Sequence, residues 1–173
     1  MPYIDGERRM MVDKPLEDLL EWCKWNVYLM ETRDETLYHI VIRILRCFYG
    51  GAGTENLPIL PVDDDRRALV DKKLNPLLDA IGKNSHLTEK LSGVLNYTIC
   101  RTLNGLYPRE VSKYSDYNNA VGVLENALDD AGIEPRFRNA ARGMIRCISM
   151  EYYRRRIAPY EQDASDLNGD IFE

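Results

Sequence analysis

Apolar residues recur along this chain with the spacing of amphipathic helices. Leu16, Leu19, Leu20 and Cys23 follow the i, i+3, i+4, i+7 pattern of one helical face. Further periodic segments cover residues 33–49, 91–106, 117–131 and 136–158, and glycine or proline lies near their ends. The pattern predicts an all-α fold with about six main helices.

Proline positions set several of the predicted helix ends. Pro15 follows Asp13-Lys14 as at a capped start, so the first helix is expected to run from there to about residue 29. Asn75-Pro76 is expected to break a later helix into two pieces, because proline has no backbone donor. Pro159 is expected to stop the last long helix at Ala158, leaving residues 163–173 as a mobile acidic tail.

The first two thirds of the chain repeat with an offset of 58 residues. Val12-Asp13-Lys14, preceded by two arginines, returns as Val70-Asp71-Lys72 with the same arginines before it. Without a gap, the repeat relates residues 7–49 to residues 65–107 and pairs the apolar positions Leu16/Leu74, Leu20/Leu78, Leu37/Leu95 and Leu45/Leu103. A duplicated helical hairpin with a pseudo-twofold axis is therefore expected within a single domain of residues 1–162.

A weaker echo with an offset of 21 residues relates the last two predicted helices. It pairs Asn118, Ala120 and Gly122 with Asn139, Ala141 and Gly143. If this echo is genuine, each element of the domain is present twice.

Composition narrows the function classes. The chain has 173 residues, 45% of them hydrophobic and 29% charged, which fits one globular domain. The net charge of −5 argues against general nucleic-acid binding. We expect neither a secretion signal nor a membrane span, and the dispersed Cys23, Cys47, Cys100 and Cys147 fit reduced thiols of a cytoplasmic protein.

Two motifs resemble a family of short, uncharacterised proteins of tailed phages and prophages. One is Gly93-Val94-Leu95-Asn96-Tyr97, and the other runs from Glu151-Tyr152-Tyr153-Arg154-Arg155 to Ala158-Pro159-Tyr160-Glu161. The start Met1-Pro2-Tyr3-Ile4 and the late Asn168-Gly169-Asp170 match as well. The resemblance implies a phage protein acting in the host cytoplasm, but it brings no established activity. This chain differs from the usual short form of that family, because its first predicted hairpin is an extra copy. Tyr38-His39 stands in this copy where Asn96-Tyr97 stands in the second.

An arginine stripe on the last long helix is the strongest candidate site. Arg138, Arg142 and Arg146 are spaced i, i+4, i+8, and Tyr153 and Arg156 fall close to the same stripe. Guanidinium groups beside a tyrosine suit phosphate binding. Asn96 and Tyr97 are the polar pair expected to complete this groove. The alternatives are a salt-bridged surface paired with Glu125, Asp129 and Asp130, and an asparagine that fixes helix register.

Two sets of carboxylates are candidates for a metal or catalytic centre. Glu31, Glu35 and His39 are spaced i, i+4, i+8, but they lack the Glu-x-x-His pairs of di-iron bundles. An all-α nucleotide pyrophosphohydrolase needs acids from two helices around Mg²⁺, for which Glu17, Glu21, Glu125 and Asp129 are the available residues. We expect no metal, no cofactor and no catalytic residues.

The sequence therefore favours a phage-encoded accessory protein that binds without catalysis. The expected role is counter-defence, by sequestering a small anionic ligand of nucleotide type in the Arg/Tyr/Asn groove. The alternatives are a protein-binding inhibitor of a host defence enzyme and, less favoured, the pyrophosphohydrolase. Self-association into a homo-oligomer is left open.

Overall fold

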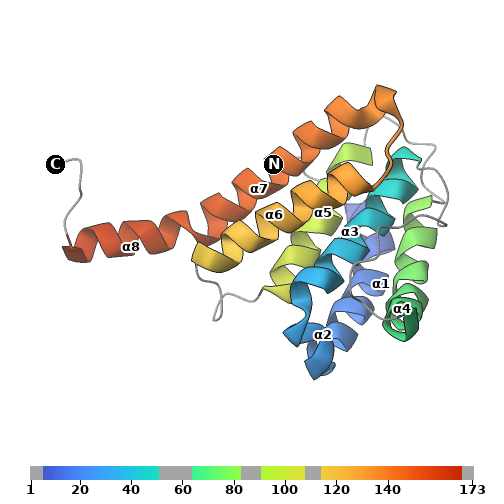
Figure 1. Ribbon diagram of the computed structural model, residues 1–173, viewed down its shortest axis with the longest axis horizontal. Coiled ribbons are helices and arrows are strands. Elements are labelled where there is room, and N and C mark those ends of the chain that lie inside the picture. Colours follow the sequence, from blue (N-terminus) through green and yellow to red (C-terminus); the bar gives the residue numbers. More distant parts are fainter. Residues whose placement is uncertain (1–5, 51–63, 83–90, 108–113, 169–173) are drawn as a thin grey trace.

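The computed structural model describes residues 6–50, 64–82, 91–107 and 114–168, and these residues form an all-α single domain, which confirms the predicted fold class (Figure 1). The elements are α1 (Gly6–Trp25), α2 (Val27–Glu31), α3 (Arg33–Tyr49), α4 (Asp64–Gly82), α5 (Leu91–Leu106), α6 (Tyr114–Asp130), a 3₁₀ turn (Pro135–Phe137), α7 (Arg138–Arg156) and α8 (Ala158–Asn168).

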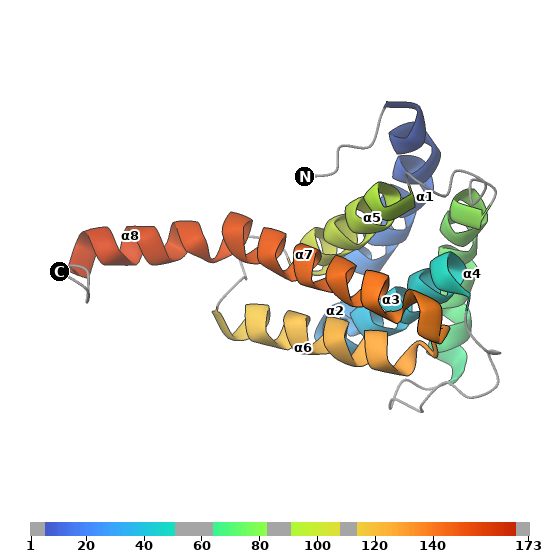
Figure 2. The same ribbon diagram turned by 90° about the horizontal axis from the view of Figure 1, so that it is seen from above.

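The helices of the two predicted hairpins pack across one another and not within each hairpin, because among the described residues neither α1 with α3 nor α4 with α5 forms a packed pair. Helix α1 packs on α4 and α5, and α3 packs on α4, α5 and α6. Helix α7 lies over α5 and α6, at the edge of the body from which α8 extends (Figures 1 and 2). Leu16, Leu37, Leu74 and Leu95 are fully buried in the shared core, so neither half has an apolar core separate from the other.

Burial at most of the paired apolar positions follows the 58-residue repeat. Of the apolar pairs expected to be buried in both copies, Leu16/Leu74, Leu37/Leu95 and Leu45/Leu103 are fully buried, while Leu20/Leu78 is only partly buried. Superposition of the two hairpins by a rotation near twofold stays a prediction.

Polar contacts between the two copies occur in reciprocal pairs. His39 Nε2 lies 2.9 Å from Asp71 Oδ1, and the Tyr97 hydroxyl donates to Asp13. The repeat relates His39 to Tyr97 and Asp71 to Asp13, so each copy reaches the same position of the other. Such an exchange of contacts is typical of a twofold relation.

Several predicted helix boundaries differ from the structure. The first helix is expected to run to about residue 29, but α1 ends at Trp25 and α2 follows as a separate short helix. Helix α1 starts nine residues before Pro15, because the buried Val12 and Leu16 hold one continuous face on the core. Helix α4 continues through Pro76, which is exposed. The backbone hydrogen bond that proline removes is lost on the solvent side, while Leu74 and Leu77 on either side are buried.

The junction after α7 also differs from the expectation. Pro159 lies in the first turn of α8, where a missing backbone donor costs little, so it starts a helix instead of ending one. Residues 163–168 of the predicted tail are helical, and residues 169–173 lie outside the described residues.

A tight turn places α7 antiparallel to α6. Gly132 has a φ of +63°, a conformation that glycine adopts without strain, and it ends α6 as the sequence predicts. Arg46 of α3 donates from Nε to the Ala131 carbonyl at 3.0 Å, and the Tyr38 hydroxyl donates to Asp130 at 2.6 Å. Helix α3 therefore fixes the end of α6 and, with it, the start of α7.

Candidate functional site

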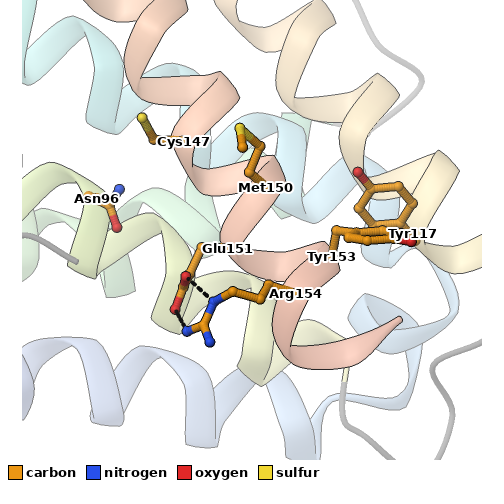
Figure 3. A pocket seen from close by; sticks show the side chains of 7 residues that line it. All are labelled: Asn96, Tyr117, Cys147, Met150, Glu151, Tyr153 and Arg154. Atoms are coloured by element: carbon orange, nitrogen blue, oxygen red, sulfur yellow. Dashed lines mark hydrogen bonds and ion pairs between the residues drawn. The ribbon is translucent and has the colours of Figure 1, made fainter. Parts of the chain in front are cut away.

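A shallow surface groove of about 560 Å³ runs along the part of α7 that faces away from the core (Figure 3). Helix α7 supplies most of its lining, and α5 and α6 each supply one residue. The lining residues are Asn96, Tyr117, Cys147, Met150, Glu151, Tyr153 and Arg154.

A single carboxylate in this groove holds two guanidinium groups. Arg154 donates to both oxygens of Glu151, from Nε at 3.1 Å and from Nη2 at 2.9 Å, and Arg155 Nε donates to one of them. The hydrogen bond from Arg154 is the main reason that the pKa of Glu151 falls to about 2. Glu151 is therefore ionised at neutral pH.

Tyrosines form the other end of the groove. The Tyr117 ring stacks on Tyr152 with centroids 5.9 Å apart and meets the edge of Tyr153 at 5.6 Å. The Tyr153 hydroxyl donates to Glu161 in α8. Because Tyr152 is buried, its ring supports the half-buried Tyr117 from the core side. The arrangement presents aromatic surface at a fixed position.

Asn96 lies on the α5 side of the groove beside a protonated thiol. Asn96 is buried, and Cys100 Sγ donates to its Oδ1 at 3.4 Å. Burial is the main reason that the pKa of Cys100 rises to about 12, and the nearby Glu151 charge contributes in the same direction. Cys100 is therefore a thiol at neutral pH and is not activated as a nucleophile.

The structure brings two of the seven predicted site residues, Asn96 and Tyr153, to this groove. Tyr97 is next to Asn96 in sequence, but its hydroxyl donates to Asp13 of α1 and Arg9 stacks over its ring at 5.4 Å. Arg156 donates from Nε and Nη2 to Asn104 Oδ1, at 3.1 and 2.7 Å.

The arginine stripe itself lies outside the groove lining. Arg138 Nε donates to the Ile133 carbonyl at 3.3 Å, and Arg142 Nη2 lies 3.8 Å from Asp129 Oδ1 with both side chains exposed. Arg146 is exposed on the same helix. Of the residues of α7 that line the groove, Tyr153 lies close to the arginine stripe, whereas Cys147, Glu151 and Arg154 follow another helical face. The Arg142 contact is the kind of ion pair that the salt-bridge alternative predicts.

Sequence reasoning missed five lining residues: Tyr117, Cys147, Met150, Glu151 and Arg154. One local signal was present, because Glu151 is three and four residues before Arg154 and Arg155, the spacing of helical ion pairs. No sequence signal places Tyr117 against Tyr153, since that contact depends on how α6 packs on α7.

The two candidate sets of carboxylates do not form a metal site among the described residues. Within the described residues, no group of three or more His, Cys, Asp or Glu side chains could hold a metal ion. His39 contacts Asp71, and Glu17 Oε1 lies 3.4 Å from Arg101 Nη2. Asp129 lies near Arg142, as described above.

All four cysteines are free thiols. Cys23 is buried and Cys147 is exposed, while Cys47 and Cys100 are partly buried. Among the described helices, none combines the length and the apolar character needed to cross a bilayer.

Compared with protein-family models, with curated proteins and with solved structures, the chain gives no significant match. The resemblance to phage proteins therefore stays a prediction from sequence motifs.

Proposed function

We propose that the protein is a phage-encoded binding protein that sequesters a small anionic ligand of nucleotide type in the α5–α6–α7 groove. The observation that carries this proposal is that an aromatic pair, a carboxamide and a guanidinium line one groove, with Asn96 on the α5 side of α7 and Tyr117 on the α6 side (Figure 3). These three chemistries match the base, the polar edges and the phosphate of a nucleotide.

Each part of the groove has a separate role in this proposal. Tyr117 and Tyr153 offer aromatic surface on which a base stacks, which contributes about 1–3 kcal/mol per base in single-stranded nucleic-acid complexes. Arg154 is oriented by Glu151 and supplies a guanidinium group, which is suited to bidentate binding of a phosphate. Asn96 supplies an amide for hydrogen bonds at the α5 side.

Sequestration accounts for a binding site without an assembled catalytic group. A host defence system that signals through a nucleotide would be silenced if the signal were held in the groove. The counter-defence role in the host cytoplasm rests on the motif resemblance and on this ligand chemistry.

A protein-binding inhibitor is the second candidate, and one observation favours it. Met150 is 71% exposed and Cys147 is exposed, so the middle of the groove presents apolar surface of the kind that protein partners cover. In that case Arg154 and Tyr153 belong to the contact surface for a host protein.

Calorimetric titration with cyclic dinucleotides, cyclic trinucleotides and ADP-ribose derivatives tests the proposal. We expect one of these probes to bind, and Arg154→Ala to weaken it roughly tenfold to a hundredfold, since a charge-assisted hydrogen bond contributes about 1.5–3 kcal/mol. Tyr153→Ala is expected to weaken it by a similar factor.

Arg138→Ala is the matched control, because Arg138 is an exposed arginine of the same helix outside the groove. It is expected to leave affinity unchanged. An equal loss in Arg138→Ala would move the site to the arginine stripe, and no binding by any probe would leave the protein-binding inhibitor as the better account.

A further inference from the structure

Helices α7 and α8 form a rod that extends beyond the rest of the molecule. Ile157 N–H donates to the Tyr153 carbonyl at 2.8 Å and Glu161 N–H donates to the Ile157 carbonyl at 2.9 Å, so helical hydrogen bonding continues across the junction. Two perpendicular views show α8 pointing away from the body (Figures 1 and 2). Of the described helices, α7 is the one against which α8 packs.

Helix α8 has the features of a helix that needs a partner. Tyr160 is 65% exposed and Leu167 is 84% exposed, and their spacing of seven residues puts them on one stripe of the helix. An exposed apolar stripe on an amphipathic helix is stabilised when another surface covers it.

Charge is segregated along the rod. Helix α7 contains six arginines and one glutamate, whereas α8 contains three acids and no basic residue. Arg142 and Arg146 are exposed on the basic half, and Asp163 and Asp166 are exposed on the acidic half. Two such rods placed antiparallel bring the acidic half of each against the basic half of the other.

We propose that a second copy of this chain covers the apolar stripe of α8. In the resulting dimer, α8 of each copy lies antiparallel along the α7 flank that carries Arg142 and Arg146 in the other copy. The contact is isologous, so it closes at two copies and forms twice per dimer. Tyr160 and Leu167 are covered at both contacts. Tyr153, which lines the groove, lies close to the same stripe, so this contact adjoins the groove.

A charge-swap experiment tests the dimer by analytical ultracentrifugation. We expect the wild type to dimerise, with weaker association at high salt because exposed charges are screened. Arg142→Glu with Arg146→Glu, or Asp163→Arg with Asp166→Arg, is expected to weaken the dimer at least about tenfold, because like charges then face each other. Combining all four changes in one chain is expected to restore it.

Lys24→Glu with Lys72→Glu is the control. These lysines are exposed on α1 and α4, and the change in net charge equals that of the double arginine variant. We expect no effect on dimerisation, and circular dichroism checks that every variant is folded. A monomeric wild type, or a four-fold variant that stays monomeric while folded, overturns the proposal.

Discussion

Glu151 is the residue on which the geometry of the groove depends. It accepts hydrogen bonds from Arg154 and Arg155, and these bonds fix both guanidinium groups on one side of α7. The Glu151 side chain is 17% exposed, whereas the arginines are 66% and 47% exposed. Because water screens the two arginines, the stabilisation from this cluster is small, and its main effect is to orient the charges.

The lowered pKa of Glu151 predicts a specific acid sensitivity. A carboxyl group with a pKa of about 2 in the folded protein and 4.5 as its ordinary value stabilises the fold above pH 4.5. That contribution is lost as the pH falls from 4.5 towards 2, and we expect its size to be about 1 kcal/mol. Chemical denaturation of wild type and Glu151→Gln at several pH values measures it.

A carboxylate that is present in both proteins changes the stability of both in the same way. Asp71 is an example: burial raises its pKa, but the hydrogen bond from His39 and nearby positive charges outweigh burial and lower it. The difference in unfolding free energy between wild type and Glu151→Gln should therefore shrink below pH 4.5. A difference that is constant from pH 7 to pH 2 would contradict the assignment.

At the scale of elements, the sequence predicts the helices whose apolar face is continuous. Residues 33–49 and 91–106 match α3 and α5 at both ends. It fails at Pro15, Pro76 and Pro159, because a proline ends a helix only where packing does not hold the flanking turns. In α4 the buried Leu74 and Leu77 hold those turns.

The candidate site could be predicted only in part for a related reason. The sequence points to Asn96 and Tyr153, which the structure places at one groove. It cannot place the arginines of α7, because helical spacing shows which side chains share a face but not which neighbour covers that face. Packing of α7 between α5 and α6 leaves Arg142 near Asp129 and puts Arg154 in the groove.

The reciprocal contacts predict that the two copies can exchange residues. His39 contacts Asp71 where the other copy uses Tyr97 to contact Asp13. His39→Leu removes a polar partner from the half-buried Asp71 and is expected to destabilise the protein by about 1–3 kcal/mol. His39→Tyr copies the residue of the equivalent position and is expected to cost less than about 1 kcal/mol.

Urea denaturation of both variants measures these costs. Tyr97→His is the matched exchange in the other direction and is expected to be tolerated in the same way. If His39→Tyr destabilises as much as His39→Leu, the two sites are not equivalent, and the reciprocal arrangement does not reflect a duplicated unit.

At the scale of the whole molecule, the elements appear in pairs with one addition. Helix α6 packs on α3 as α7 packs on α5, while α3 and α5 are related by the 58-residue repeat. The weaker 21-residue echo relates buried positions as well: Ala120 and Ala141 are both buried, and so are Leu124 and Ile145. Helix α8 has no described counterpart in this scheme, and it carries the acidic half of the rod to which we assign self-association.

The central claim is that the groove along α7 holds a small anion. Native mass spectrometry of protein purified from phage-infected or defence-induced cells tests it most directly. The account predicts a retained small anionic ligand on the wild-type protein and its loss from Arg154→Ala. Wild-type protein that carries no small molecule under these conditions, or that instead retains a host protein, would contradict the claim.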